Sequence, residues 1–222
     1  MSVVKLEGLV ALLEGFPALT GVDLTVNAGE IVFVKGPNGA GKTTLLHLCA
    51  GLIQPKEGKG QILGHDLSSE RTSIRKRVGL LSHSSGLYRD LTVLENITFW
   101  TQIAGVEKSE IDNRISWALE RMELDNKLQN QKVRSLSVGQ KRRASLAVFI
   151  VRRPDLWLMD EPHAGLDQEG RQAVDDLIEE SVKAGATVIV ASHDLERVLN
   201  LATRVVTLSG GAVVGVDHGG NK

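Results

Sequence analysis

An α/β fold with a mainly parallel core sheet is predicted by two features of the 222-residue sequence. Short runs rich in valine, isoleucine and leucine alternate with segments of helical periodicity, which is the pattern of parallel strands covered by helices. A chain of this length provides one large core, or one core with a smaller inserted subdomain. We therefore expect a single domain over residues 1–222, with a core from 1–83 and 152–222 and a helical subdomain over about 84–151.

The first elements are expected to be strands of an N-terminal antiparallel β layer. Residues 3–6 and 19–26 alternate between apolar and polar side chains, as half-buried antiparallel strands do. Ala28 and Gly29 form a turn signal, and the run 30–35 that follows, apolar from Ile31 to Val34, predicts a buried strand.

The middle section, about 84–151, is expected to be almost wholly helical. Thr92 and Glu95 have the spacing of a capping box, in which each residue satisfies a backbone N–H at a helix start. Ser109 precedes an amphipathic run with apolar residues at helical spacing. These apolar residues are Ile111, Ile115, Ala118, Leu119 and Met122. The section therefore predicts an inserted helical subdomain.

Strands and helices alternate again in the last third of the chain. We expect a strand over 155–159, a helix over 168–183 and a strand over 186–191. A short helix should follow Ser192, and two strands around 205–208 and 212–216 should close the fold.

The charge and cysteine content limit the classes of partner. With 26 Lys and Arg against 27 Asp and Glu, the net charge of -1 gives no basic excess to neutralise nucleic-acid phosphates, so no nucleic acid is expected. The single cysteine, Cys49, fits a reducing compartment and is interpreted as a small buried apolar side chain in a helix.

The chain has no sequence pattern of a secretory signal or a membrane span. Lys5, Glu7 and Glu14 interrupt the N-terminal apolar residues, so this segment is expected to stay on the protein. No run approaches the ~20 apolar residues that a membrane-spanning helix requires. Any membrane role is therefore expected to come through a partner.

A glycine-rich motif predicts a phosphate-binding loop. It fits G-x-x-x-x-G-K-[ST] and lies between an apolar strand and a helical pattern, which is the context that confirms the motif. Its glycines let backbone N–H groups and the positive end of the helix point at phosphates. The lysine should contact the β- and γ-phosphates of a nucleotide, and the first threonine should bind Mg²⁺. The motif consists of Gly36, Pro37, Asn38, Gly39, Ala40, Gly41, Lys42, Thr43 and Thr44.

Two acidic residues end the apolar strand at 155–159 and supply the other groups that phosphoryl transfer needs. Asp160 is expected to hold Mg²⁺, directly or through water, and Glu161 to polarise the attacking water. On spacing alone such a pair is also compatible with a helix cap. The phosphate-binding loop favours the catalytic interpretation.

A second motif precedes this acidic pair, and with it the sequence resembles the ABC ATPase family of P-loop NTPases over essentially its whole length. The motif is Leu136, Ser137, Val138, Gly139 and Gln140. A serine near a helix start with an adjacent glycine can cap the helix and present N–H groups to an anion. The resemblance implies that Ser137, Gly139 and Gln140 close over ATP held by another subunit, so that two ATP molecules lie in a head-to-tail dimer. Val138 replaces the family's commoner glycine, which should matter little if its φ is negative.

Three further residues are assigned by their similarity in position to family motifs. Asp167 is similar to the aspartate of the loop that crosses the dimer interface, although it could also cap the next helix. His193 matches a histidine that contacts the γ-phosphate, although it could also be a polar loop residue. His83 stands where most members carry a glutamine that contacts Mg²⁺ and the attacking water, and a hydrogen-bonding role through water is expected of it. The residue that stacks on adenine stays open between Leu13 and Phe16.

A finer resemblance is to the haem-exporter ATPases of cytochrome c maturation. It rests on residues 91–96, 140–143, 156–157 and 160–163, together with His83. The resemblance also implies that the region around Tyr88 to Trp100 receives a helix of a membrane subunit, although the apolar side chains there could be plain core.

The resemblance implies a transport ATPase that hydrolyses ATP with Mg²⁺ as a homodimer or with a related cassette. It would drive an integral membrane permease from the cytoplasmic face of the cell membrane. The alternative is an ATPase of iron–sulfur cluster assembly that works with a scaffold outside the membrane. A P-loop kinase or GTPase would leave the motif at 136–140 and the role of Glu161 unexplained.

Overall fold

The computed structural model describes residues 1–82 and 84–218. The chain forms two compact units. The first, called unit 1, consists of Met1–Leu80, Asp155–Pro162 and Ile178–Lys222. The second, called unit 2, consists of Leu81–Pro154 and His163–Leu177.

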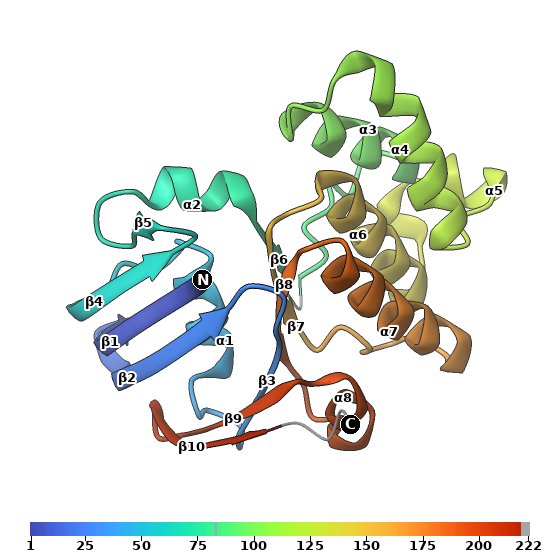
Figure 1. The fold of residues 1–222 in the computed structure, drawn as a ribbon. Coiled ribbons are helices and arrows are strands. Elements are labelled where there is room, and N and C mark those ends of the chain that lie inside the picture. The colour runs from blue at the N-terminus through green and yellow to red at the C-terminus, as the bar shows by residue number, and fades with distance from the viewer. Residues whose placement is uncertain (83, 219–222) are drawn as a thin grey trace. The chain divides into compact units, whose positions relative to one another are not determined.

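Unit 1 begins with a four-stranded sheet in the order β2-β1-β4-β5 (Figure 1). Its strands are β1 (Ser2–Leu13), β2 (Phe16–Asn27), β4 (Glu57–Ile62) and β5 (His65–Asp66). The pairs β1–β2, β1–β4 and β4–β5 are all antiparallel, so the expected antiparallel N-terminal layer is confirmed.

The first hairpin is longer than the sequence predicted. Leu13 pairs with Phe16 across a two-residue turn, in which Glu14 has φ 51° and Gly15 has φ 87°. Two consecutive positive φ values match the twist of a tight hairpin. Register shifts along β1 and β2 interrupt the strict alternation of side chains, which is why only residues 3–6 and 19–26 stood out in the sequence.

The second sheet of the fold has the order β10-β9-β3-β8-β7-β6. Its strands are β3 (Ile31–Lys35), β6 (Val78–Leu81), β7 (Leu156–Asp160), β8 (Thr187–Ala191), β9 (Arg204–Ser209) and β10 (Ala212–His218). Strands β9, β3, β8 and β7 pair in parallel, and β10 is antiparallel to β9. The predicted α/β class with a mainly parallel core sheet is therefore confirmed.

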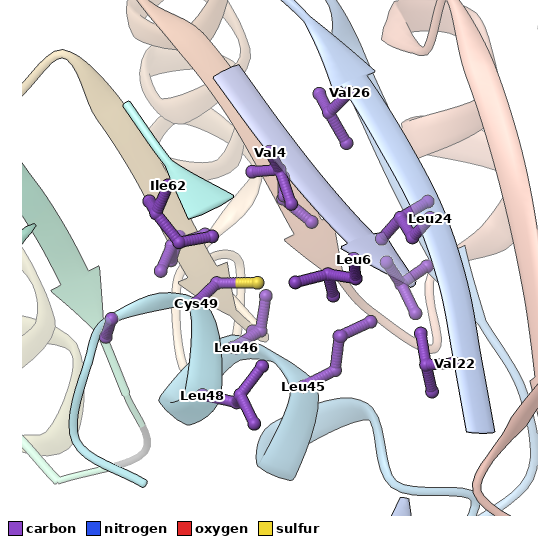
Figure 2. Packing of buried hydrophobic residues seen from close by; sticks show 14 of the residues in the cluster. Val4, Leu6, Val22, Leu24, Val26, Leu45, Leu46, Leu48, Cys49 and Ile62 are labelled. Atoms are coloured by element: carbon purple, nitrogen blue, oxygen red, sulfur yellow. The ribbon is translucent and has the colours of Figure 1, made fainter. Parts of the chain in front are cut away.

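The core of unit 1 is built where helix α1 (Lys42–Cys49) packs against strands of the N-terminal sheet. Figure 2 shows side chains of the helix pointing toward those of β1 and β2, among them Leu45, Leu46, Val4 and Leu6. Cys49 is fully buried in this cluster, as expected, and burial raises the pKa of its thiol to about 12. This packing fixes the start of α1, and with it the glycine-rich loop. Two further short helices, α2 (Arg71–Arg77) and α8 (Leu195–Leu201), also lie wholly within unit 1.

Unit 2 is helical (Figure 1), as the sequence predicted for the middle section of the chain. It contains α3 (Val93–Ile103), α4 (Lys108–Arg121), α5 (Asn126–Gln129), the 3₁₀ turn η1 (Val133–Ser135), α6 (Val138–Arg152) and α7 (Gln168–Lys183) as far as Leu177. The capping box of Thr92 and Glu95 is confirmed at the start of α3. Ser109 lies inside α4, because that helix begins one residue earlier, at Lys108.

Over residues 1–82 and 84–218, no helix combines the length and the apolar character needed to cross a membrane. Within the same ranges, no three histidine, cysteine, aspartate or glutamate side chains gather as a metal-binding cluster.

Candidate functional site

The glycine-rich loop of unit 1 requires glycine at two points because the backbone passes close to neighbouring chain. A Cβ atom on Gly36 would lie 2.2 Å from the carbonyl oxygen of Leu208. Gly41 has φ 100°, and a Cβ there would lie 2.6 Å from the carbonyl oxygen of Ala18. The loop can therefore take this path only with glycine at both positions.

The loop leads directly into the start of helix α1. Gly41 is the N-cap residue of that helix and provides no side-chain hydrogen bond to the first-turn N–H groups. Uncapped N–H groups at a helix start, together with the helix dipole, favour an anion. The geometry of the loop thus fits a phosphate group.

Lys42 is nearly buried and its ammonium group is held at the loop. Its Nζ donates hydrogen bonds to the carbonyl oxygens of Gly36 at 2.7 Å and Pro37 at 3.0 Å. The charge is therefore placed over the loop that the anion would occupy, as the motif predicts. Ala40 and Thr44 are buried, whereas Asn38, Gly39 and Thr43 are exposed.

Thr43 and Asp160 lie together although they are 117 positions apart in the sequence. The Thr43 hydroxyl donates a hydrogen bond of 2.8 Å to Oδ2 of Asp160, which ends β7 and is almost fully buried. The two side chains form an oxygen pair beside the phosphate-binding loop, and oxygen ligands are those that Mg²⁺ prefers. The residues therefore fit the predicted metal.

Glu161 occupies a strained backbone position directly after β7. Its φ is 48°, and its backbone N–H donates to the carbonyl oxygen of Ala191 at 2.8 Å. A non-glycine residue in this region costs of order 1–3 kcal/mol, and such residues cluster at functional sites. The strained position is thus occupied by the residue to which the sequence assigned the catalytic carboxylate.

Two residues that follow β8 contact the Glu161 carboxylate. Ser192 donates a hydrogen bond of 2.9 Å to Oε2, and Nε2 of His193 lies 3.7 Å from Oε1. The structure thus brings together Glu161 and His193, both assigned from the sequence, and adds Ser192, which sequence reasoning missed. Its only signal was its place after a parallel strand, at the edge where ligands bind in open α/β sheets.

In unit 2, Ser137 and Gln140 form a capping box at the start of α6. The Ser137 hydroxyl accepts a hydrogen bond from the Gln140 N–H at 3.2 Å, and the Gln140 side chain accepts one from the Ser137 N–H at 2.9 Å. Val138, the first residue of the helix, is 73% exposed and is not among the residues with positive φ, so its backbone tolerates a non-glycine residue. Gly139 packs closely on the loop at 164–167, because a Cβ there would lie 2.9 Å from the carbonyl oxygen of Gly165.

Asp167 caps helix α7, which is one of the two roles that the sequence left open. Its Oδ1 accepts a hydrogen bond from the Gly170 N–H at 2.9 Å and lies 3.2 Å from Nη2 of Arg143. The bond from Gly170, together with the nearby Arg143 guanidinium, holds the pKa of Asp167 below its usual value. The side chain is nevertheless largely exposed, so the cap does not remove it from the surface.

The structure does not place three of the residues considered from the sequence in the site. His83 lies outside the described residues. Leu13 and Phe16, the two candidates for stacking on adenine, are both exposed on either side of the β1–β2 turn, so the choice between them stays open.

Comparisons with known proteins place this geometry in a family. Residues 19–164 match the family described as "ABC transporter". The chain is 35% identical over 214 residues to the cell division ATP-binding protein FtsE of Escherichia coli. This alignment covers 95% of this chain and 94% of that protein. It is 32% identical to the daunorubicin/doxorubicin resistance ATP-binding protein DrrA of Streptomyces peucetius and 36% identical to the sulfate/thiosulfate import ATP-binding protein CysA 1 of Agrobacterium fabrum. Each of these two alignments covers 95% of this chain, which spans only 64% and 62% of the length of those relatives.

Solved structures agree with this match. A dimeric ATP-binding cassette in a post-hydrolysis state, bound to ADP and Pi, superposes with a TM-score of 0.88 at 28% identity, over 97% of this chain and 98% of that chain. The protein cbiO1 from Clostridium perfringens, part of the ABC transporter complex cbiONQ, gives 0.83 at 28% identity, over 98% and 88% of the two chains.

The family match covers more than half of the sequence, and each relative named above exceeds 30% identity over most of the chain. The chain therefore belongs to the ABC transporter family and has the P-loop fold of its ATP-binding cassettes.

Proposed function

We propose that the chain is the ATP-binding subunit of an ABC transporter, which hydrolyses ATP with Mg²⁺ as a pair and drives a membrane permease. The observation that carries the proposal is the hydrogen bond between Thr43 and Asp160, with Glu161 directly after Asp160. These groups are the metal ligands and the water-activating carboxylate that phosphoryl transfer requires beside a phosphate-binding loop. We also propose that residues 1–222 act as one ABC ATPase domain, with a core from 1–83 and 152–222 and a helical subdomain over about 84–151.

The loop at 36–44 would bind the phosphates of ATP. Its backbone N–H groups and the start of α1 provide donors, and Lys42 provides a positive charge over the loop. Thr43 and Asp160 would hold Mg²⁺, which supplies charge neutralisation at the phosphate oxygens when it is bound. The binding residues proposed are Gly36, Pro37, Asn38, Gly39, Ala40, Gly41, Lys42, Thr43 and Thr44.

The Glu161 carboxylate would accept a hydrogen bond from the attacking water and so make that water more nucleophilic. The Ser192 hydroxyl donates to Oε2, which orients the carboxylate and leaves Oε1 on the side of His193. His193 would donate a hydrogen bond to the γ-phosphate, where negative charge develops. His83 is proposed to hydrogen-bond the same water.

The second copy would complete each site with Ser137, Gly139, Gln140 and Asp167. In the capping box the Ser137 hydroxyl acts as acceptor, so its own proton remains for a phosphate oxygen. The likeness to a dimeric cassette bound to ADP and Pi supports this arrangement.

The membrane partner is proposed to dock on unit 2 near the start of α3. Tyr88 is half exposed, meets Phe99 edge-to-face and stacks on Trp100. Ile97, by contrast, is fully buried and belongs to the core of the unit. The similarity to cbiO1, which is part of an ABC transporter complex, supports assembly with other transporter components, and the chain's place is proposed to be the cytoplasmic face of the membrane.

A haem-exporter role in cytochrome c maturation is the finer proposal. It rests on the resemblance at residues 91–96, 140–143, 156–157 and 160–163 and on His83. Relatives described as acting in drug resistance, sulfate import and cell division match at 32% to 36% identity, so overall similarity does not favour one cargo.

Purification of the tagged chain from detergent-solubilised membranes tests the proposal. We expect a multispanning membrane protein to copurify in stoichiometric amount, and identification of that protein tests the haem-exporter assignment. Copurification of a scaffold from the membrane-free fraction alone would instead favour the iron–sulfur assembly alternative. A Tyr88→Ala variant should lose the membrane protein, whereas the matched exposed variant Trp117→Ala on α4 should retain it.

A further inference from the structure

We propose that Arg143 and Val138 are positioning residues that hold the loop at 164–167 against helix α6, so that the loop and the motif at 136–140 form one preassembled surface. The inference rests on the proposed function, because the surface is the one presented to the second copy. All of these residues lie within unit 2.

The loop at 164–167 packs closely against the first turn of α6. Gly165 has φ 76°, and a Cβ atom on it would lie 2.9 Å from Cγ1 of Val138. A Cβ on Gly139 would lie at the same distance from the Gly165 carbonyl oxygen. The helix start and the loop backbone therefore approach as closely as two glycines allow, and the Val138 side chain fills the place where the family's commoner glycine has none.

The ionic part lies one helical turn further along α6. Arg143 is four residues after Gly139, so both residues lie on the same face of the helix. Its Nη2 lies 3.2 Å from Oδ1 of Asp167, and its Nη1 donates to Glu123. The Arg143 side chain is only 16% exposed, so this pair is less screened by water than an ordinary surface pair.

The close approach of Val138 and the Arg143 contact restrain two positions of the loop. Val138 limits the movement of Gly165, and Arg143 limits that of Asp167. Asp167 uses Oδ1 for both Arg143 and the cap of α7, which leaves Oδ2 on a largely exposed side chain for the second copy. Free in solution, the chain thus already has its signature residue Ser137 and its loop residue Asp167 in one fixed arrangement, which lowers the entropy lost on pairing.

The test uses the Glu161→Gln background, in which ATP-bound dimers should accumulate, and measures dimer formation against protein concentration at saturating Mg²⁺ and ATP. Arg143→Gln should raise the concentration for half-maximal dimer formation about tenfold, because each dimer contains two such contacts. Binding of a fluorescent ATP analogue to the monomer should be unchanged, which a general structural defect would not allow.

Three further comparisons separate the positioning role from other causes. Glu123→Gln removes the other ion pair of Arg143 and should change dimer formation by less than about twofold. In an Asp167→Asn background, where the cap of α7 is retained, Arg143→Gln should lose most of its effect, because its partner charge is already gone. Gly165→Ala should also weaken dimer formation, and Val138→Gly should recover part of that loss by removing the 2.9 Å contact.

The outcomes distinguish this inference from the function on which it rests. If the Glu161→Gln chain alone forms no ATP-dependent dimer, the proposed function fails. If it does form one, and Arg143→Gln leaves dimer formation unchanged or multiplies independently with Asp167→Asn, the positioning role is wrong.

Discussion

The Thr43 hydroxyl donates a 2.8 Å hydrogen bond to the Asp160 carboxylate across 117 positions of sequence. The fold explains this contact, because β3 and β7 both pair in parallel with β8, so their carboxyl ends lie at the same edge of the sheet. The phosphate-binding loop leaves from β3 and the acidic pair ends β7. Parallel pairing therefore places the proposed phosphate site and the proposed metal-binding carboxylate side by side.

Asp160→Asn should abolish Mg²⁺-dependent ATP hydrolysis while leaving the fold intact. The amide keeps the shape of the side chain and an oxygen that accepts from Thr43, but it removes the charge that a divalent cation requires. We expect a loss of at least about 100-fold in kcat, measured over a Mg²⁺ titration. Asp155→Asn, which removes an exposed carboxylate paired with Arg77, is the matched control and should keep full activity.

Gly36→Ala should damage both stability and ATP binding. The added Cβ would lie 2.2 Å from a backbone oxygen that cannot move aside, so we expect the free energy of unfolding to fall by about 3 kcal/mol. Gly39→Ala is the control, because its Cβ meets nothing within 4 Å and only the positive φ of 77° is unfavourable. Its cost should be about 1 kcal/mol in urea unfolding. Equal losses in the two variants would show that the close approach is not what requires glycine at position 36.

Asp175→Ala should destabilise unit 2 through the histidine that it leaves behind. His163, in the loop before α7, lies 2.8 Å from Asp175 through Nε2, and both side chains are more than nine-tenths buried. Removing the acceptor should lower the free energy of unfolding by about 2 kcal/mol. Asp175→Asn should recover most of that loss, and Asp176→Ala, at the half-exposed neighbouring position, should cost less than about 0.5 kcal/mol.

Arg143→Gln should raise the pKa of Asp167. The Gly170 N–H and then the Arg143 charge hold that pKa below its ordinary value, so the interaction stabilises the fold above the unfolded-state pKa and is lost as pH falls through the lower folded-state value. The variant should shift the Asp167 titration toward higher pH, as measured by carbon-detected NMR of the carboxyl group. A titration that coincides with that of the unchanged chain would mean that Arg143 does not act on Asp167 in solution.

Much of the fold could be predicted because periodicity and turn chemistry are local. Each capping box, at Thr92 and at Ser137, lies within four consecutive residues, and helices α3 and α6 start directly after those two residues. Strand β1 was harder to predict, since its register shifts place apolar residues out of alternation. Individual long-range contacts were harder to predict from local patterns. Ser192 follows β8 and reaches Glu161 at the end of the neighbouring strand β7, and Arg143 on α6 reaches Asp167 in the loop before α7, so only the folded chain reveals these contacts.

Glu161→Gln tests the central claim most directly. The amide preserves the size of the side chain but is a poor base, so ATP hydrolysis at saturating Mg²⁺ and ATP should fall by about 100- to 10,000-fold while ATP affinity is retained. Size-exclusion chromatography with light scattering should then detect an ATP-dependent dimer that disappears when ATP is removed. Hydrolysis at the rate of the unchanged chain would contradict the assignment of Glu161 as the water-activating carboxylate, and with it the proposed mechanism.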